Sequence, residues 1–360
     1  MGKGAELWRS GRGTPSGGAS WNVRSRHCVR RPASGALSCL RNDPARLIFS
    51  GHQLVRGHRS MSNTSLRLCF ILNGKSGSCD PVTVSEAIQR IAADHGAEAH
   101  VHLVREGSNI AQLVRTALKD GAQIVVAGGG DGTINAVASE LVGSAVPLGV
   151  LPLGTLNHFA KALSVPLSLN EAITNVFTGE ARDVDVGEVN GYVFLNNSGI
   201  GLYPRIVLDR EASEKQGRAK WFASVQAATR KLKNYHLMHV ALKTDSGEQI
   251  VRATPFLFIG NNKYETSGLG IGSRTRLDAG RLWISLAPEA GRLRLLVLAI
   301  LAVVGRLKEP HLEVLEAADL EVKTRQRRLE VAMDGEVRVL ASPLRYRSLS
   351  KALRVIVPSA

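Results

Sequence analysis

At 360 residues the chain is long enough for two domains, and its 44% content of apolar residues is ordinary for a soluble globular protein. The net charge of +15 is unevenly placed, because residues 1–60 hold eleven Lys and Arg against two acidic residues. The four cysteines, Cys28, Cys39, Cys69 and Cys79, form no CxxC pair. This spacing argues against a zinc site or a disulfide framework and indicates a reducing compartment.

The first 60 residues differ from the rest of the chain. They are rich in Gly, Ser and Arg and show no sustained apolar periodicity, so we expect a disordered basic segment. A transit peptide, a basic arm and untranslated sequence ahead of Met61 remain open as explanations, and Met61 is the working start. A secretory signal is not expected, because no apolar stretch follows the first basic residues.

From residue 61 to residue 182 apolar strands alternate with amphipathic helices. Strands are expected at 66–72, 99–103, 123–127 and 147–151, with helices at 84–93 and 109–118 and after each of the last two strands. This alternation predicts an α/β domain with a doubly wound parallel sheet that binds its ligand at the carboxyl ends of the strands.

Residues 183–360 follow a different pattern, with short strands joined by turns. The clearest turn is Asn190-Gly191, between strands at 184–189 and 192–195. Further strands are expected at 236–243, 250–260, 281–286, 319–323, 329–333 and 353–357, and helices at 218–231 and 293–304. The pattern predicts a mostly antiparallel β domain whose last strand could return to the first domain. The crevice between the domains is the expected site.

Two glycine-rich turns stand where a strand ends and a helix begins. The first is Gly128-Gly129-Gly130-Asp131-Gly132-Thr133, and the second is Pro152-Leu153-Gly154-Thr155-Leu156-Asn157. Backbone N–H groups and positive helix ends at neighbouring turns suit a polyphosphate. The P-loop pattern fails because Cys69 stands at its first glycine, and the dinucleotide pattern fails because Thr133 stands at its third.

Four motifs between residues 66 and 358 resemble those of the diacylglycerol kinase catalytic-domain family, which includes sphingosine and ceramide kinases. They are Asn73-Gly74-Lys75-Ser76-Gly77, Gly129-Gly130-Asp131-Gly132-Thr133-Ile134-Asn135, the run from Leu151 to Lys161, and Asp334-Gly335-Glu336. The chain departs from the family pattern at His158, where the family has Asp. NAD kinases and phosphofructokinases share the glycine loop, whereas the combination of motifs is specific to lipid kinases.

The resemblance implies roles for individual residues, with ATP and Mg²⁺ as cofactors. Glu336 would accept the proton of the attacking hydroxyl, and Asp131 would either do so instead or help to hold Mg²⁺. A structural metal carboxylate falls at Asp278, one position earlier than in bacterial members. The nucleotide would be bound by Asn73, Lys75, Ser76, Gly77, Gly129, Gly130, Asp131, Gly132, Thr133, Asn135, Gly154 and Thr155.

These features predict a cytoplasmic, peripherally membrane-associated lipid kinase that phosphorylates diacylglycerol. An NAD kinase-like enzyme and a catalytically silent nucleotide- or lipid-binding protein stay open as alternatives. The expected partners are a lipid substrate and an anionic membrane surface; no nucleic acid is expected, and a homodimer is left open. The apolar run 295–304 is too short to span a bilayer and is either a core helix or an interfacial helix between basic residues.

Overall fold

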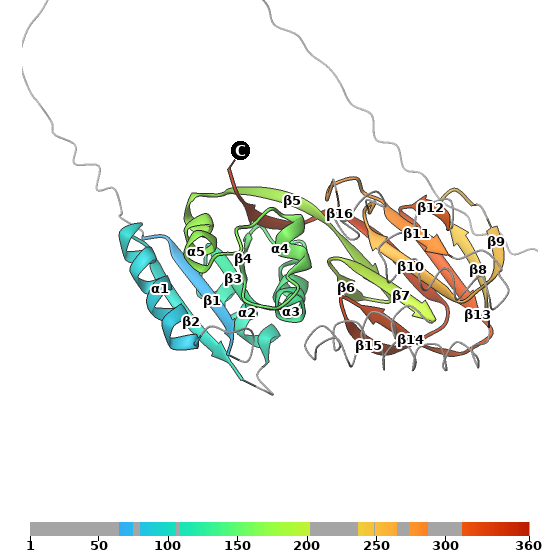
Figure 1. The fold of residues 1–360 in the computed structure, drawn as a ribbon, viewed down its shortest axis with the longest axis horizontal. Coiled ribbons are helices and arrows are strands. Elements are labelled where there is room, and N and C mark those ends of the chain that lie inside the picture. The colour runs from blue at the N-terminus through green and yellow to red at the C-terminus, as the bar shows by residue number, and fades with distance from the viewer. Residues whose placement is uncertain are drawn as a thin grey trace, which may run out of the picture. The chain divides into compact units, whose positions relative to one another are not determined.

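The structure, a computed structural model, describes residues 65–74, 80–105, 109–201, 237–247, 249–264, 274, 276–286 and 312–359. By its contacts the chain divides into two units, Met1–Met61 and Ser62–Ala360, and every described residue belongs to the second unit. Within this second unit, helices flank one part of a large sheet, and strands alone make up the other described part (Figure 1).

The first part is a parallel sheet covered by helices. Its strands are β1 (Arg67–Asn73), β2 (Glu98–Val104), β3 (Ile124–Gly129) and β4 (Leu148–Pro152), in the spatial order β2-β1-β3-β4. Its helices are α1 (Pro81–Asp94), α2 (Ile110–Lys119), α3 (Asp131–Leu141), α4 (His158–Ala162) and α5 (Leu169–Thr178). Helix α1 contacts α5, and α2 contacts α3. The doubly wound parallel sheet predicted from the sequence is confirmed.

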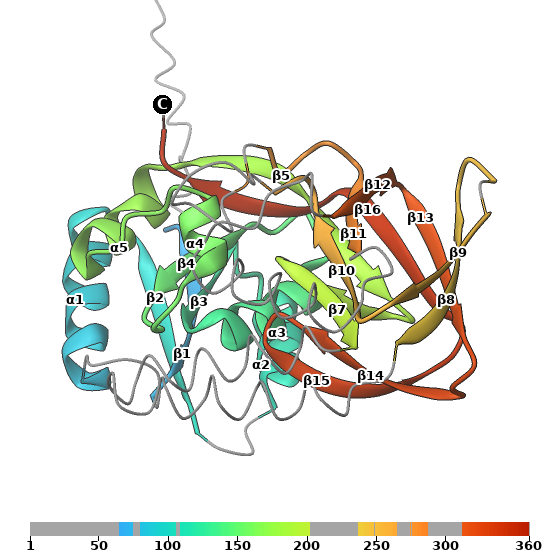
Figure 2. The same cartoon turned by 45° about the vertical axis from the view of Figure 1, so that its right-hand side comes forward.

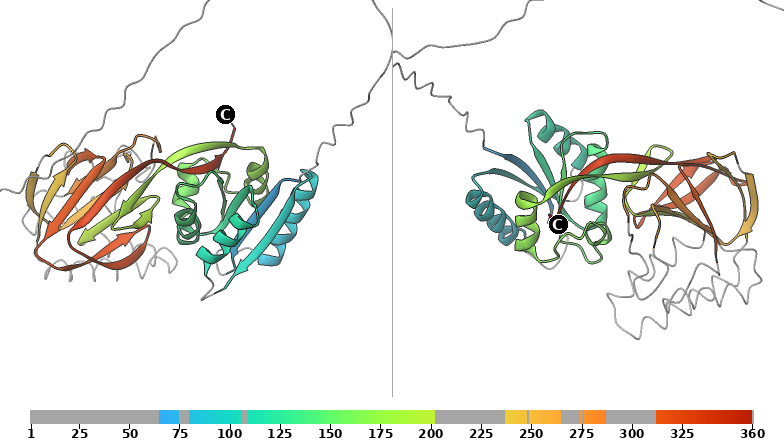
Figure 3. Two further views of the ribbon diagram at one scale, coloured as in Figure 1. Left: turned by 180° about the vertical axis from the view of Figure 1, so that it is seen from behind. Right: turned by 90° about the horizontal axis from the view of Figure 1, so that it is seen from above.

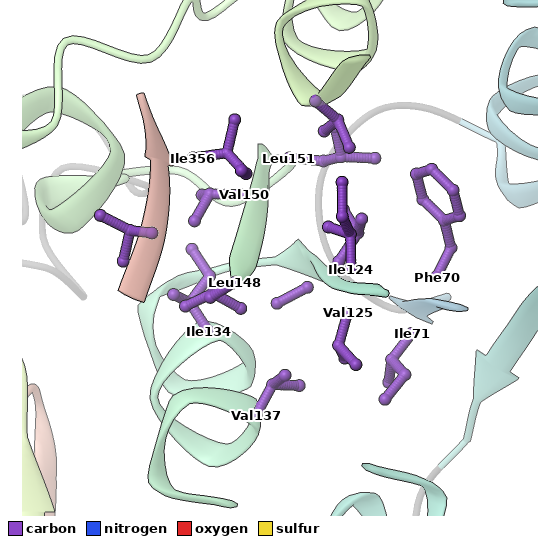
Figure 4. Close-up of a cluster of buried hydrophobic side chains, with 14 of the residues drawn as sticks. Phe70, Ile71, Ile124, Val125, Ile134, Val137, Leu148, Val150, Leu151 and Ile356 are labelled. Atoms are coloured by element: carbon purple, nitrogen blue, oxygen red, sulfur yellow. The ribbon is translucent and has the colours of Figure 1, made fainter. Parts of the chain in front are cut away.

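The apolar strands of this sheet lie buried in the core of the first part. All six residues of β3 are buried, and Figure 4 shows Phe70 and Leu151 on one side of the sheet and Val125 and Val137 on the other. Each fully buried side chain of this size contributes roughly 1.5–3 kcal/mol to folding. The core therefore fixes the strand ends that carry the glycine turns.

Capping residues set where two of the helices begin. The Asp80 carboxylate accepts a hydrogen bond from the Thr83 N–H at 3.2 Å, and Pro81 follows it in the first helical turn. Helix α1 thus starts earlier than the predicted residue 84. Asn109 caps α2 in the same way, through the Gln112 N–H at 3.1 Å.

The second part of the chain is mostly antiparallel, as predicted. A six-stranded sheet has the order β12-β11-β10-β7-β14-β15, and the strands β13, β8 and β9 extend the first sheet. The bounds are β6 (Tyr192–Phe194), β7 (Asn197–Gly201), β8 (Met238–Thr244), β9 (Gln249–Thr254), β10 (Phe256–Asn261), β11 (Leu282–Leu286), β12 (Glu313–Ala317), β13 (Asp319–Thr324), β14 (Arg328–Met333) and β15 (Glu336–Ala341).

The single strand predicted for residues 250–260 is wrong. The chain forms β9 and β10 there, and these two strands belong to different sheets. Pro255 stands between them, and a proline has no N–H with which to continue a strand ladder. The predicted Asn190-Gly191 turn is confirmed, because Val189 pairs with Tyr192 and both turn residues have positive φ.

Two long strands run through both parts of the fold. Strand β5 (Glu180–Val189) pairs along most of β16 (Leu344–Val357), which also pairs with β13 near its start and with β4 near its end (Figure 3). The predicted strand at 353–357 is therefore only the final portion of β16. The β5–β16 register shifts between Leu349 and Leu353.

The buried Asp185 holds this irregularity in place. Its carboxylate accepts hydrogen bonds from the Lys351 N–H at 2.8 Å and from the Gly280 N–H at 2.6 Å. Lys351 has a φ of 51°, a left-handed conformation that an L-residue adopts at some cost.

The helices predicted at 218–231 and 293–304 lie outside the described residues. In the described part of the chain, no helix is both long and apolar enough to cross a membrane.

Candidate active site

Most of the predicted site residues that the structure describes lie where the parallel sheet reverses its winding. Strand β1 has β2 on one side and β3 on the other, so the carboxyl ends of β1 and β3 flank a switch point, where ligands of such sheets bind. Asn73 ends β1, and Thr133 stands in the first turn of α3, directly after β3. The Asn73 amide donates to the Thr133 hydroxyl at 3.0 Å, which joins the two strand ends.

The two glycine turns pack backbone against backbone. A Cβ placed on Gly154 would lie 2.4 Å from the Gly130 Cα, so no larger residue fits at position 154. Asn157, with a φ of 52°, closes the second turn: its Oδ1 accepts from the Gly154 N–H, and its amide donates to the Pro152 and Gly154 carbonyls. Thr155 is exposed on this turn.

The beginning of α3 suits an anionic ligand. Gly130 is the N-cap residue, and among the described residues no side chain caps the helix. Its first N–H groups and its positive end therefore point toward the glycine turns, where phosphate oxygens could accept hydrogen bonds.

Asp131 joins the two turns. One of its carboxylate oxygens accepts from the His158 N–H at 3.2 Å, and the other accepts from the Phe159 N–H at 3.1 Å. Asp131 thereby caps α4 from a neighbouring helix, a contact that the sequence did not reveal. Each carboxylate oxygen keeps a second lone pair, so a role for Asp131 as proton acceptor or Mg²⁺ ligand stays a prediction.

Glu336 reaches this region from the other part of the fold. A Cβ placed on Gly132 would lie 3.4 Å from Glu336 Oε1, so the carboxylate stands directly over the glycine loop. Its other oxygen lies 3.3 Å from Arg338 Nη2, and 59% of the side chain is exposed. A carboxylate that is exposed and close to the glycine turns is placed where a general base would be needed if those turns bind phosphate.

Asp334 and Gly335 form the two-residue turn between β14 and β15, both with positive φ. The Asp334 carboxylate is buried and accepts from the backbone N–H groups of residues 195–197 at 2.7, 2.8 and 3.0 Å. Burial raises the pKa of Asp334, and these hydrogen bonds act in the opposite direction. The Asp-Gly pair signalled a hairpin, but nothing in the sequence signalled the buried carboxylate contacts.

Asn135, predicted to orient the nucleotide, is engaged within the protein. Its amide donates to Asp334 Oδ2 and to the Val193 carbonyl, and its Oδ1 accepts from the Ser139 hydroxyl. The β14–β15 hairpin thus meets the side of α3 (Figure 2). Of the remaining predicted residues, Lys75, Ser76 and Gly77 lie outside the described residues.

Asp278 stands apart from this constellation. Its carboxylate accepts from Arg276 Nε at 3.1 Å, and this hydrogen bond holds the pKa of Asp278 below its usual value. No cluster of three or more His, Cys, Asp or Glu side chains that could hold a metal occurs among the residues the structure describes. A metal role for Asp278 stays a prediction.

Comparison with known proteins identifies the family of the chain. A family described as the diacylglycerol kinase catalytic domain matches residues 67–189, and one described as the YegS C-terminal NAD kinase beta sandwich-like domain matches residues 207–357. A Pseudomonas aeruginosa protein named "Probable lipid kinase YegS-like" is 31% identical over 305 residues, which cover 81% of this chain and 95% of that protein. The chain belongs to the YegS-like lipid kinases.

One further relative supports this family, and one solved structure supports the fold. The protein named "Lipid kinase YegS" of Escherichia coli K12 is 39% identical over 145 residues, which cover 39% of this chain and 48% of that protein. A crystal structure described as a diacylglycerol kinase from Bacillus anthracis shares the fold, with a TM-score of 0.61, 21% identity and coverage of 82% of this chain and 97% of that one. The resemblance predicted from the four motifs is confirmed.

Proposed function

We propose that this lipid kinase transfers the γ-phosphoryl group of ATP to the hydroxyl of diacylglycerol and forms phosphatidic acid. The observation that carries the proposal is the Glu336 carboxylate over Gly132, at the N-terminus of α3. This arrangement brings a proton acceptor beside a turn suited to phosphate, and phosphoryl transfer to an alcohol requires both.

Each part of the site would make a separate contribution. The N–H groups that begin α3 would hold the phosphate oxygens, and the Asn73–Thr133 contact keeps the two strand ends in register around them. The lipid oxygen would attack the γ-phosphorus while its proton passes to Glu336. The bond from the γ-phosphorus to the bridging oxygen would break, and ADP would leave.

The residues present fit a magnesium ion that is held mostly by the nucleotide. Mg²⁺ in kinases is commonly bound by one or two carboxylates, phosphate oxygens and water rather than by a protein cage. Asp131, at the start of α3, is the described carboxylate on the glycine loop itself and would supply one ligand. When bound, the ion would neutralise the charge that develops on the phosphate oxygens.

Incubation of the full chain with γ-labelled ATP and a mixed lipid extract tests the proposal. Labelled phosphatidic acid is the expected product. Label in NADP after NAD is added, with none in lipid, would replace the proposal with an NAD kinase. Nucleotide binding without any labelled product would indicate a catalytically silent protein.

We further propose that the enzyme docks peripherally on anionic membranes, because its substrate resides in a bilayer and no described helix can cross one. The basic residues expected to contribute lie near 218–233 and 292–308, outside the described residues. Co-sedimentation with anionic and with zwitterionic vesicles across a salt series tests this. Binding should require the anionic lipid and weaken as salt is added. Binding that is independent of lipid charge and of salt concentration would contradict the proposal.

A further inference from the structure

The segment that leads from β6 into β7 comprises the two connecting residues, 195 and 196, and the first residue of β7, Asn197. We call residues 195–197 the connector, and side chains bind both its N–H groups and its carbonyl groups. Its three successive N–H groups all donate to the Asp334 carboxylate. A carboxylate that receives three backbone donors cannot shift without leaving several of them unsatisfied. Asp334 is therefore fixed relative to this connector.

The carbonyl edge of the connector is fixed as firmly. Arg274, only 7% exposed, donates from Nη1 to the Leu195 carbonyl at 2.7 Å and from Nη2 to Asn196 Oδ1 at 2.9 Å. The Tyr264 hydroxyl donates to the Asn196 carbonyl at 2.9 Å. Half-buried hydrogen bonds to the N–H groups and buried ones to the carbonyl side make the connector a rigid base for the β14–β15 turn.

Asn135 connects this rigid base to the glycine loop. It lies on α3, three residues after Gly132, and its amide donates to Asp334 Oδ2 and to the Val193 carbonyl of β6. The Ser139 hydroxyl, one turn further along α3, lies 2.8 Å from the Asn135 carbonyl and 3.0 Å from Asn135 Oδ1, so its hydrogen is shared between the two oxygens. Both polar atoms of the Asn135 side chain are thus used within the protein.

We infer that the Asn135–Asp334 contact is a positioning device for phosphoryl transfer: it sets the distance between Glu336 and the glycine loop. Glu336 stands two residues after Asp334, and Gly132 stands three residues before Asn135, so one half-buried contact joins the two chain segments that must meet. Asn135 and Asp334 touch neither reactant and act through Glu336. The inference rests on the proposed function and assigns Asn135 a role other than nucleotide binding.

A double-mutant cycle with Glu336→Gln tests the inference in the full chain. Asn135→Ala should lower kcat for lipid phosphorylation on the order of 10²-fold, because a small displacement of a reacting group has such an effect. The KM for ATP should change little. In the Glu336→Gln background the same substitution should have almost no further effect on kcat, since the group that it positions is already disabled.

Equal slowing in both backgrounds, or a loss confined to the KM for ATP, would overturn the inference and return Asn135 to nucleotide binding. Asn135→Ser, which shortens the side chain but keeps it polar, serves if the alanine variant folds poorly. Glu140→Gln is the matched control on the same helix. It removes a surface ion pair with Arg115 and should leave both kinetic parameters unchanged.

Hydrogen exchange gives a second readout that needs no turnover. Amides of residues 195–197 and 333–337 should exchange faster in Asn135→Ala than in the wild type or in Glu140→Gln. Unchanged exchange would overturn the inference even if lipid phosphorylation is never observed. Conversely, an inactive wild-type protein with the expected exchange difference would count against the proposed function alone.

Discussion

Gly130 and Gly154 lie in contact, yet they are constrained differently. A methyl group on Gly154 would lie 2.4 Å from the Gly130 Cα and 3.1 Å from its nitrogen, and backbone cannot move aside as a side chain can. We expect Gly154→Ala to destabilise the fold by about 1–3 kcal/mol through overpacking. A thermal melt of the purified variant should show this as a clear fall in Tm.

Gly130→Ala is the matched variant, because its methyl group would lie 3.7 Å from the Gly154 Cα, an ordinary contact distance. It should melt close to the wild type but bind ATP weakly, since the methyl group would stand where the phosphates approach the α3 N-terminus. A nucleotide titration measures this. If Gly130→Ala binds ATP as tightly as the wild type does, the first glycine turn is not part of the nucleotide site.

Asp131→Asn separates the chemical role of this residue from its structural one. We expect turnover to be lost, because the proposed phosphate site loses a charge. We also expect a stability loss of about 1–2 kcal/mol, because one of the two oxygens that cap α4 becomes an N–H₂ group facing a backbone donor. Assays of labelled lipid and urea denaturation measure the two effects. Normal turnover with reduced stability would show that Asp131 is only a cap.

At the scale of elements, the β5–β16 irregularity depends on a single carboxylate. Asp185→Asn would leave either the Lys351 N–H or the Gly280 N–H opposite an amide donor, with an expected stability loss of about 1–3 kcal/mol. Amide exchange should rise in residues 349–353. Asp183→Asn, on the same strand but paired only loosely with Arg354 at 3.7 Å, is the control and should change little. Similar losses in both variants would contradict a special role for Asp185.

Local sequence patterns predicted most of the elements but few of the contacts between them. Apolar runs and glycine turns indicated the parallel strands, and Asn190-Gly191 indicated its hairpin, because these signals lie within a few residues of one another. The division of residues 250–260 at Pro255 could have been read from the proline. The Asn135–Asp334 contact joins positions 199 residues apart, and one sequence carries no local signal for such a partner.

At the scale of the whole molecule, one buried thiol and two buried tyrosine hydroxyls should lower the free energy of unfolding at alkaline pH. Burial raises the pKa of Cys69 from 9.0 to about 11, and it also raises the pKa values of Tyr264 and Tyr346 above 10.0. Above these ordinary values the unfolded chain releases protons that the folded chain still holds. The stabilisation is therefore complete below about pH 9 and is lost as the pH rises.

Urea denaturation at a series of pH values from about 8 to about 11 should show the free energy of unfolding level near pH 8 and falling above about pH 9. Tyr346→Phe removes one of the contributing groups, so its stability should depend less steeply on pH than that of the wild type. A free energy of unfolding that stays level or rises over this range would contradict the expectation.

The position of β16 at the end of the chain affects how the protein folds during synthesis. Strand β16 follows every other described strand in the chain, yet it is the neighbour of β4, which a ribosome produces almost two hundred residues earlier. Until β16 is made, β4 presents an unpaired edge, and such edges invite association with other chains. The parallel sheet therefore cannot be completed during translation of its own segment. A chain that ends before residue 344 lacks β16, so we expect it to be degraded by proteases rather than to accumulate as a stable folded fragment.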